Sequence, residues 1–134
     1  MENRTVFDTN IWVSYVLGSK LYELTKFAFD NDILFLRSMP SVAELREVLS
    51  RKKFEKYNFD IEEIIDVYTD ISEFCHTKPQ FNGCADPKDN YLFDLALQGN
   101  ANYLVSGDAK VLATPIKSKT LKIVTLKGFR DDFV

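Results

Sequence analysis

Short apolar runs alternate along this chain with longer segments in which apolar residues recur at helical spacing. The short runs predict buried β-strands at 4–8, 33–37, 73–76, 102–106 and 121–125. The longer segments predict helices at 11–17, 20–29, 41–50, 61–73 and 88–98, with short helical turns near 52–57, 109–112 and 127–131. Strands separated by helices predict an α/β fold, in which helices cover both faces of a parallel sheet of about five strands.

The chain has 134 residues, which we expect to fold as one domain over 1–134. Its hydrophobic content of 46%, with 11 Phe and 6 Tyr, excludes a disordered chain. No apolar run approaches the length of a membrane span, and the first residues contain no signal-peptide core. Cys75 and Cys84 lack the spacing of a zinc site and suit a reducing compartment. We therefore expect a cytoplasmic protein without membrane association.

Charge is distributed unevenly, although the formal net charge is only −3. Residues 60–73 contain six acids and no base, whereas residues 109–130 contain six bases and no acid. On a helix over 61–73 the acids fill one arc of about 100°, which predicts a solvated face rather than a catalytic one. The segregation permits a positive surface beside a negative pocket, which suits a polyanionic substrate.

Two acids stand at or just beyond the ends of predicted strands. Asp8 follows residues 5–7 and precedes an apolar helix start, and Asp108 follows residues 103–106 and a glycine. Either carboxylate could simply cap the helix that it precedes. In open parallel sheets, however, ligands bind beyond the carboxyl ends of the strands, which is where both acids fall. This position favours a functional role for Asp8 and Asp108.

A third acid lies in the apolar stripe of a predicted helix. On the helical wheel Asp89 is flanked by Leu92, Phe93 and Ala96. A carboxylate within a buried stripe is costly unless it is paired or bound to a metal. Asp94, about 140° away on the same wheel, is expected to face solvent.

A fourth acid, Glu44, borders the apolar face of the predicted helix 41–50, about 40° from Val48. Glu44 also matches the N3 position of a capping box that begins at Ser41, and the sequence leaves both roles open. Asp86 before Pro87 is typical of a helix start, which explains this acid without a functional role.

A cluster of these acids would need a counter-charge. Two carboxylates about 5 Å apart repel by roughly 3 kcal/mol at an effective dielectric constant of about 20. Folding alone gains nothing from such a cluster, so a bound cation is expected. All-oxygen ligands favour Mg²⁺ or Mn²⁺ over zinc, and the single histidine, His76, gives zinc little support. The pattern favours a metal-dependent enzyme that acts on phosphate esters.

Four blocks of sequence, in order, carry a family resemblance: residues 6–11 with Ser14, residues 41–51, residues 86–93 and residues 101–108. With these blocks the chain resembles the PIN-domain family of metal-dependent ribonucleases over nearly its whole length. The last block ends in Ser-Gly-Asp and is similar to the VapC-like toxin subgroup of type II toxin–antitoxin systems. One Asp-Thr-Asn motif alone is weak evidence, whereas four blocks at these spacings are specific.

The resemblance implies a PIN-like three-layer α/β/α sandwich that hydrolyses RNA phosphodiester bonds. It implies that one or two Mg²⁺ or Mn²⁺ ions are bound by four catalytic acids, Asp8, Glu44, Asp89 and Asp108. Asn10 and Ser106 are similar to supporting polar residues beside the metals. Members of the family commonly form homodimers, and its toxins are silenced by a small antitoxin protein. We expect both kinds of partner for this chain.

RNA contacts are predicted from the basic residues. Lys52, Lys53 and Lys110 are candidate phosphate contacts, although a run of charge is more commonly a solvated face. Single-stranded RNA is favoured over a duplex, because exposed aromatic side chains can stack on unpaired bases.

Two alternatives to a ribonuclease stay open. A phosphatase or phosphoacceptor could use Asp8 as its nucleophile, although Asn10 stands where a haloacid dehalogenase-like motif has a second Asp. A PIN-like module could instead bind RNA or a partner protein without cutting, and the presence of all four acids argues against it. A trapped phosphoaspartate would support the first alternative, and metal-free RNA binding without cleavage would support the second.

Overall fold

The computed structural model describes residues 2–134, and in this range five parallel strands form one sheet. The strands are β1 (Asn3–Phe7), β2 (Ile33–Arg37), β3 (Ser72–Phe74), β4 (Tyr103–Val105) and β5 (Lys122–Val124). Their order is β3-β2-β1-β4-β5, so the first strand lies at the centre. The direction of strand addition reverses beside β1, and sheets of this kind bind ligands beyond the carboxyl ends of the strands at such a point.

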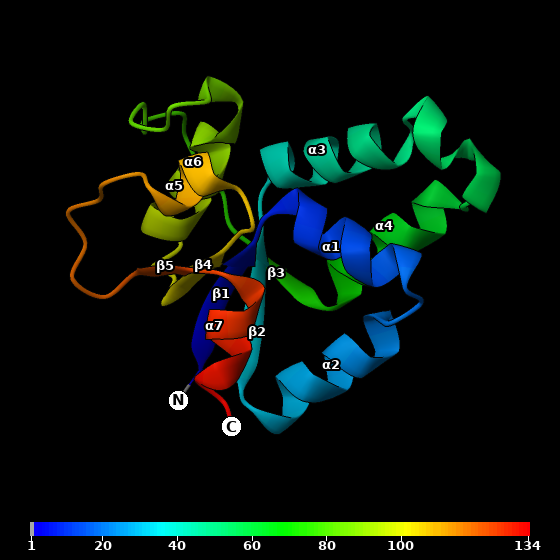
Figure 1. Cartoon of the computed structure of the whole chain (residues 1–134), viewed down its shortest axis with the longest axis horizontal. Helices are drawn as coiled ribbons and strands as arrows, with labels where there is room; N and C mark the ends of the chain where they lie inside the picture. The colour runs from blue at the N-terminus through cyan, green and yellow to red at the C-terminus, as the bar shows by residue number, and fades with distance from the viewer. Residues whose placement is uncertain (1) are drawn as a thin grey trace.

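Helices cover both faces of the sheet. They are α1 (Thr9–Leu17), α2 (Leu21–Asp30), α3 (Met39–Leu49), α4 (Ile61–Asp70), α5 (Asn90–Gln98), α6 (Ala109–Leu112) and α7 (Leu126–Asp131), with 3₁₀ turns η1 (Lys52–Tyr57) and η2 (Pro87–Asp89). Figure 1 shows α1 to α4 on one side of the sheet and α5 with α6 on the other. The predicted three-layer α/β/α sandwich is confirmed.

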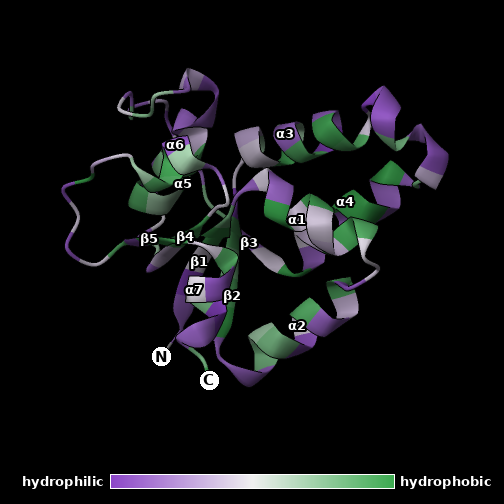
Figure 2. Cartoon of the chain, viewed as in Figure 1, coloured by the Kyte–Doolittle hydropathy of each residue, from purple (hydrophilic) through white to green (hydrophobic). Residues whose placement is uncertain are grey.

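Successive residues of the central strands point into two separate cores. Phe7, Phe35 and Val105 belong to the core under α1, whereas Val6 and Leu36 belong to the core under α5. This alternation is the consequence of the two-residue period of a strand. Because both faces are buried, the strands are continuously apolar, and Figure 2 shows β2 and β4 mostly in the hydrophobic colour. The two cores fix the position of β1, whose end carries Asp8.

The predicted helix over 61–73 is too long at its C-terminal end. α4 ends at Asp70, and the chain enters β3 at Ser72 because it pairs there with β2. Glu73 therefore lies on a strand opposite Leu36, and its carboxylate forms an ion pair with Arg4 at 3.3 Å. The other acids of this segment keep their place on the helix.

α3 begins at Met39, two residues earlier than predicted, and has a different cap. The Ser38 side chain accepts from the N–H of Ser41 at 3.3 Å, and Ser41 Oγ accepts from the N–H of Ser38 at 2.8 Å. Pro40 fits this first turn because its missing N–H has no intrahelical partner there. Of the two roles that the sequence left open for Glu44, the capping box with Ser41 is therefore wrong, and Glu44 is not needed as a cap.

The structure also bears on the predictions that the chain lacks a membrane span and that its two cysteines are reduced. Across residues 2–134, no helix combines the length and the apolarity that a membrane crossing requires. Cys75 and Cys84 are both free thiols. Burial raises the pKa of the Cys75 thiol, which lowers its reactivity.

Candidate active site at the carboxyl end of the sheet

Asp8 lies just beyond β1, where the strand turns into α1, and only 6% of its surface is exposed. Its backbone N–H donates to Val105 O at 2.9 Å, which holds the turn against the neighbouring strand β4. Its Oδ1 accepts from the N–H of Asn10 at 3.3 Å and caps α1. Asp8 therefore caps α1, but the cap uses only Oδ1, and Oδ2 remains available for another partner.

Ser106 connects Asp8 to Asp108. The parallel register pairs the last residues of β1 and β4, so the residues that follow them are neighbours. The buried Ser106 hydroxyl donates to Asp8 Oδ2 at 2.7 Å and accepts from the N–H of Asp108 at 3.0 Å. Asp108 Oδ1 accepts from the N–H of Lys110 at 2.9 Å and caps α6. Two acids that follow different strands are thus joined through one hydroxyl.

Asp89 is the last residue of η2, directly before α5. Burial raises its pKa to about 6, and the negative charges of Asp8, Asp86, Asp108 and Glu44 add to this shift. Like charges raise the pKa of a carboxyl only from nearby positions. The helices next to Asp8 and Glu44, α1 and α3, pack against each other, and Figure 1 shows their starts close together above the strand ends. We call the four predicted acids, Asp8, Glu44, Asp89 and Asp108, the carboxylate cluster.

A hydrogen bond ties the start of α1 to α5 beside the carboxylate cluster. Thr9 Oγ1 and Tyr91 Oη lie 2.7 Å apart. Burial raises the pKa of the Tyr91 phenol, and the charges of Asp8 and Glu44 raise it further, so the phenol stays protonated. Sequence reasoning missed this pair, because the partners are 82 residues apart and no periodic pattern relates them.

Within the described part of the chain, the four acids of the carboxylate cluster form no ion pair, although the pKa of Arg51 is raised by its hydrogen bond to Glu47 and, more weakly, by the negative charge of Glu44. Among residues 2–134, none of the ion pairs involves Asp8, Glu44, Asp89 or Asp108. In the same part of the chain, no three Asp, Glu, His or Cys side chains are arranged closely enough to hold one ion together. Carboxylates that repel one another are expected to stay apart until a cation neutralises them. Their donor set, made of partly buried carboxylate oxygens without an ion pair among residues 2–134, fits Mg²⁺ or Mn²⁺.

A family model described as PIN domain matches residues 4–125. The chain belongs to the PIN-domain family. Its fold is also similar to a chain in the crystal structure of VapBC2 from Rickettsia felis bound to a DNA fragment from their promoter. That likeness has a TM-score of 0.61 at 18% identity and covers 91% of this chain and 98% of the other, so it supports the fold alone. No curated protein sequence matches the chain.

The supporting residue Asn10 and the three lysines predicted to contact RNA lie at different distances from the carboxylate cluster. Asn10 is exposed on the first turn of α1, and Lys110 is exposed on α6 just after Asp108. Lys52 and Lys53 lie on η1, beyond the far end of α3, eight or more residues after Glu44. At the rise of a helix this separation is about 12 Å. Lys110 is therefore the predicted RNA contact that stands beside the cluster.

The prediction that Asp94 faces solvent is wrong, because only 7% of its surface is exposed. Its Oδ1 accepts from the N–H groups of Gln80 and Phe81 at 3.0 and 2.7 Å and from Gln98 Nε2 at 3.3 Å. These bonds hold the segment between β3 and η2 against α5. The helical wheel missed the burial because this segment has no periodic pattern. Asp86 caps η2 through the N–H of Lys88 at 3.1 Å, as predicted.

Proposed function

We propose that this PIN-domain protein is an endoribonuclease that depends on Mg²⁺ or Mn²⁺. The observation that carries the proposal is the carboxylate cluster, in which acids from separate segments interact at one end of the sheet and form no ion pair among residues 2–134. Such a cluster opposes folding unless a cation neutralises it. Membership of the PIN-domain family supports the same function.

The role proposed for each residue follows from its surroundings. Asp8 is held by Ser106 and by the N–H of Asn10, so its carboxylate is the most firmly oriented of the proposed metal ligands. Asp89 makes no capping hydrogen bond to α5, so its carboxylate is free to turn toward an ion or to accept a proton from water. A divalent cation, when bound, supplies the positive charge that activates water and stabilises the leaving oxygen. Lys110 is placed to contact a phosphate of the RNA.

The variant Asp89→Asn tests the proposal, because it removes one charge and preserves the shape of the side chain. We expect cleavage of a generic single-stranded RNA in Mn²⁺ to slow by at least about 100-fold. The matched control is Asp66→Asn on the exposed face of α4, which should cleave at the wild-type rate. EDTA should stop the wild-type reaction. Full activity of Asp89→Asn would refute the proposal, and wild-type RNA binding without cleavage would favour a binding module.

We further propose that the ribonuclease is the toxin of a toxin–antitoxin pair, acting in the cytoplasm as a homodimer with a small antitoxin protein as its partner. The support is membership of the PIN-domain family together with the fold likeness to a chain of the VapBC2 complex. Induced expression in bacterial cells should arrest growth, and Asp89→Asn should relieve the arrest. Arrest that persists in this variant would separate toxicity from RNA cleavage.

A further inference from the structure

A hollow of about 320 Å³ opens beside the carboxylate cluster, between the start of α3 and α5. Its lining includes three prolines and two aromatic side chains around one acid, namely Pro40, Pro79, Pro87, Phe81, Tyr91 and Asp94. We call this hollow the Asp94 pocket. Apolar walls that also present a few polar groups, here Asp94 with Thr77, Lys88 and Asn90, are typical of a ligand site.

The Asp94 pocket shares a wall with the carboxylate cluster. Tyr91 forms that wall, and its hydroxyl is bonded to Thr9, the residue after Asp8. Asn90, which also lines the pocket, follows Asp89 directly. The pocket is therefore connected to the carboxylate cluster through Asn90 and Tyr91.

The two oxygens of Asp94 have different surroundings. Oδ1 accepts all three of the hydrogen bonds that the carboxylate receives from residues 2–134. Among residues 2–134, Trp12 Nε1 is the fully buried side-chain polar atom that has no hydrogen-bond partner. Asp94 Oδ2 also has no partner in this range but is not among such fully buried atoms, so some of its surface is accessible. Asp94 lines the pocket, and Oδ2 is the oxygen that the hydrogen bonds from residues 2–134 leave free. A carboxylate that is more than nine-tenths buried thus keeps one oxygen available to a ligand.

The wall opposite α5 is held in place before any ligand arrives. Gln98 Oε1 accepts from the N–H of Lys78 at 2.9 Å, and Gln98 Nε2 donates to Lys78 O at 2.7 Å. Phe81 stacks on Phe93 with ring centroids 4.5 Å apart and an angle of 15° between the rings. A pocket with walls fixed in this way loses little conformational entropy when it is filled.

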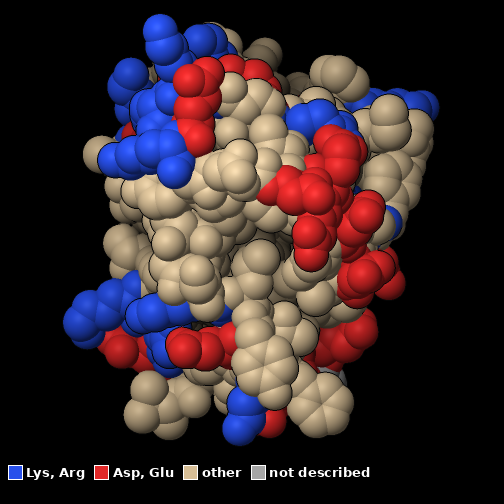
Figure 3. All heavy atoms as spheres, turned by 90° about the vertical axis from the view of Figure 1, so that its right-hand side faces the viewer, with Lys and Arg blue, Asp and Glu red and all other residues tan. Residues whose placement is uncertain are grey.

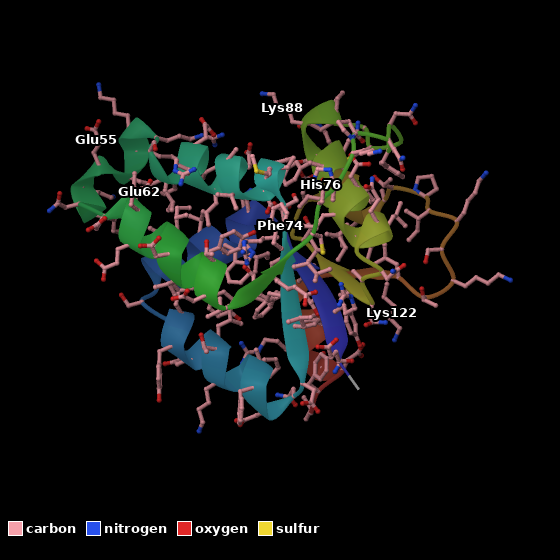
Figure 4. The ribbon with its side chains drawn as sticks, turned by 180° about the vertical axis from the view of Figure 1, so that it is seen from behind. Glu55, Glu62, Phe74, His76, Lys88 and Lys122 are labelled. Carbon is pink, nitrogen blue, oxygen red and sulfur yellow. The ribbon has the colours of Figure 1, made fainter. Side chains whose placement is uncertain are left out.

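We propose that the Asp94 pocket binds an RNA base next to the cleaved phosphodiester and that Asp94 Oδ2 accepts a hydrogen bond from the exocyclic amine of that base. The inference rests on the proposed ribonuclease function. Cytosine presents an amine where uracil presents a carbonyl oxygen, and two acceptors facing each other repel. The pocket therefore selects cytosine over uracil. Lys88 at its rim points away from the ribbon in Figure 4, where its charge can pair with a backbone phosphate.

Paired oligoribonucleotides test this selection in the wild-type protein. Each pair differs only by cytosine or uracil at one position beside the cleaved bond, and the positions on both sides are tested in turn. At one position we expect the cytosine substrate to be cleaved roughly tenfold faster or more, because a hydrogen bond to a charged acceptor is gained and a repulsion is avoided. Equal cleavage at every position would overturn the proposal.

The isosteric variant Asp94→Asn should reverse the preference. Its amide oxygen can keep the bonds to Gln80 and Phe81, while its NH₂ replaces Oδ2 and donates to the carbonyl of uracil. The control Gln98→Leu breaks the bonds to Lys78 and the 3.3 Å bond to Asp94 Oδ1 but keeps the carboxylate and its Oδ2, so both substrates should slow together. A merely structural role of Asp94 would change both substrates alike. Equal changes in the cytosine-to-uracil ratio in the two variants would therefore overturn the proposal.

Binding without cleavage separates this inference from the ribonuclease proposal. The Asp89→Asn variant should bind the cytosine oligonucleotide more tightly than its uracil partner, as measured by fluorescence anisotropy. If the wild type cleaves neither substrate while this preference persists, the ribonuclease proposal fails and the base pocket stands. If the wild type cleaves both equally and the variant binds both equally, the base pocket fails alone.

Discussion

Two groups of acids on this molecule differ in what surrounds them. On α4, Glu62, Glu63, Asp66 and Asp70 all face solvent, and Figure 3 shows acids gathered in a band on the side of the molecule that carries this helix. Arg46 donates to both oxygens of Glu62 at 3.0 Å. Water and a base therefore compensate these charges, and the acids serve as a solvated face, as the sequence predicted.

The acids of the carboxylate cluster are less exposed to water, and none of them forms an ion pair among residues 2–134, so their negative charges are compensated less. Burial and like charges raise the pKa of Asp89 to about 6, whereas the hydrogen bond from Arg46 lowers the pKa of Glu62. The same chemical group is thus pushed in opposite directions at two places on one molecule. An uncompensated charge, rather than a high density of acids, marks the candidate site.

The variant Ser106→Ala should disturb the carboxylate cluster most. It leaves Asp8 Oδ2 and the N–H of Asp108 without their buried partner. We expect the affinity for Mn²⁺ to fall about 10- to 100-fold and the free energy of unfolding to fall by about 1–3 kcal/mol. Calorimetric titration with Mn²⁺ and thermal unfolding in EDTA measure the two effects.

The matched control for Ser106 is Ser50→Ala. The Ser50 hydroxyl is exposed at the end of α3 and donates to Arg46 O at 2.7 Å, away from the strand ends. Its loss should leave the Mn²⁺ affinity at the wild-type value. Equal losses of affinity in the two variants would contradict a special link between Ser106 and the cluster.

The sequence predicted the strands better than the boundary between α4 and β3. The apolar run 33–37 coincides with β2, because a strand buried on both faces has a continuous apolar pattern. Helical periodicity instead continues past Asp70 to Glu73, and only pairing with β2 ends the helix earlier. Local pattern therefore predicts an element well when burial alone decides it, and poorly when a distant strand does.

The same limit applies to the candidate site. Asp8 and Asp108 could be singled out because they stand at strand ends, and Asp89 because it stands in an apolar stripe, whereas the functional role of Glu44 came from the resemblance to the PIN-domain family. The bond between Thr9 and Tyr91 could not be predicted, because it joins segments that meet only in the folded chain. The burial of Asp94 was missed for a related reason, since its cover is an irregular segment without hydrophobic periodicity.

The variant Tyr91→Phe should have a smaller effect than Ser106→Ala, because Tyr91 acts through Thr9 rather than on a carboxylate oxygen. We expect the Mn²⁺ affinity to fall by less than about tenfold and the free energy of unfolding to fall by about 1 kcal/mol. The control is Tyr103→Phe, which loses a bond to Asp132 at 2.9 Å, remote from the acids. A loss of Mn²⁺ affinity in both variants would mean that the effect is one of general stability.

The smallest effect should appear in the pH dependence of the metal-free protein. Because the folded pKa of Asp89 is about 6 and its usual value is 3.8, the folded state binds the proton more tightly than the unfolded state between these values. Stability in EDTA should therefore fall as the pH rises from 4 through 6. Asp89→Asn removes this loss, so its melting temperature at pH 7 should exceed that of the wild type. A lower melting temperature for the variant would count against a tight cluster.

The variant Glu62→Gln should change the pH dependence of stability in the opposite direction to Asp89→Asn, which sharpens the comparison between the two groups of acids. Arg46 holds the folded pKa of Glu62 below its usual 4.5, so the stabilisation is present above that value and is lost as the pH falls through the folded pKa. The melting temperature of Glu62→Gln should lie slightly below that of the wild type at pH 7 and approach it in acid. The melting temperature of Asp89→Asn should lie above that of the wild type at pH 7 and also approach it in acid. Because Glu62 is solvent-exposed, its effect should also shrink in high salt. Melting curves of both variants in EDTA, at pH 4 and pH 7 and at two salt concentrations, would show whether compensation separates the two groups.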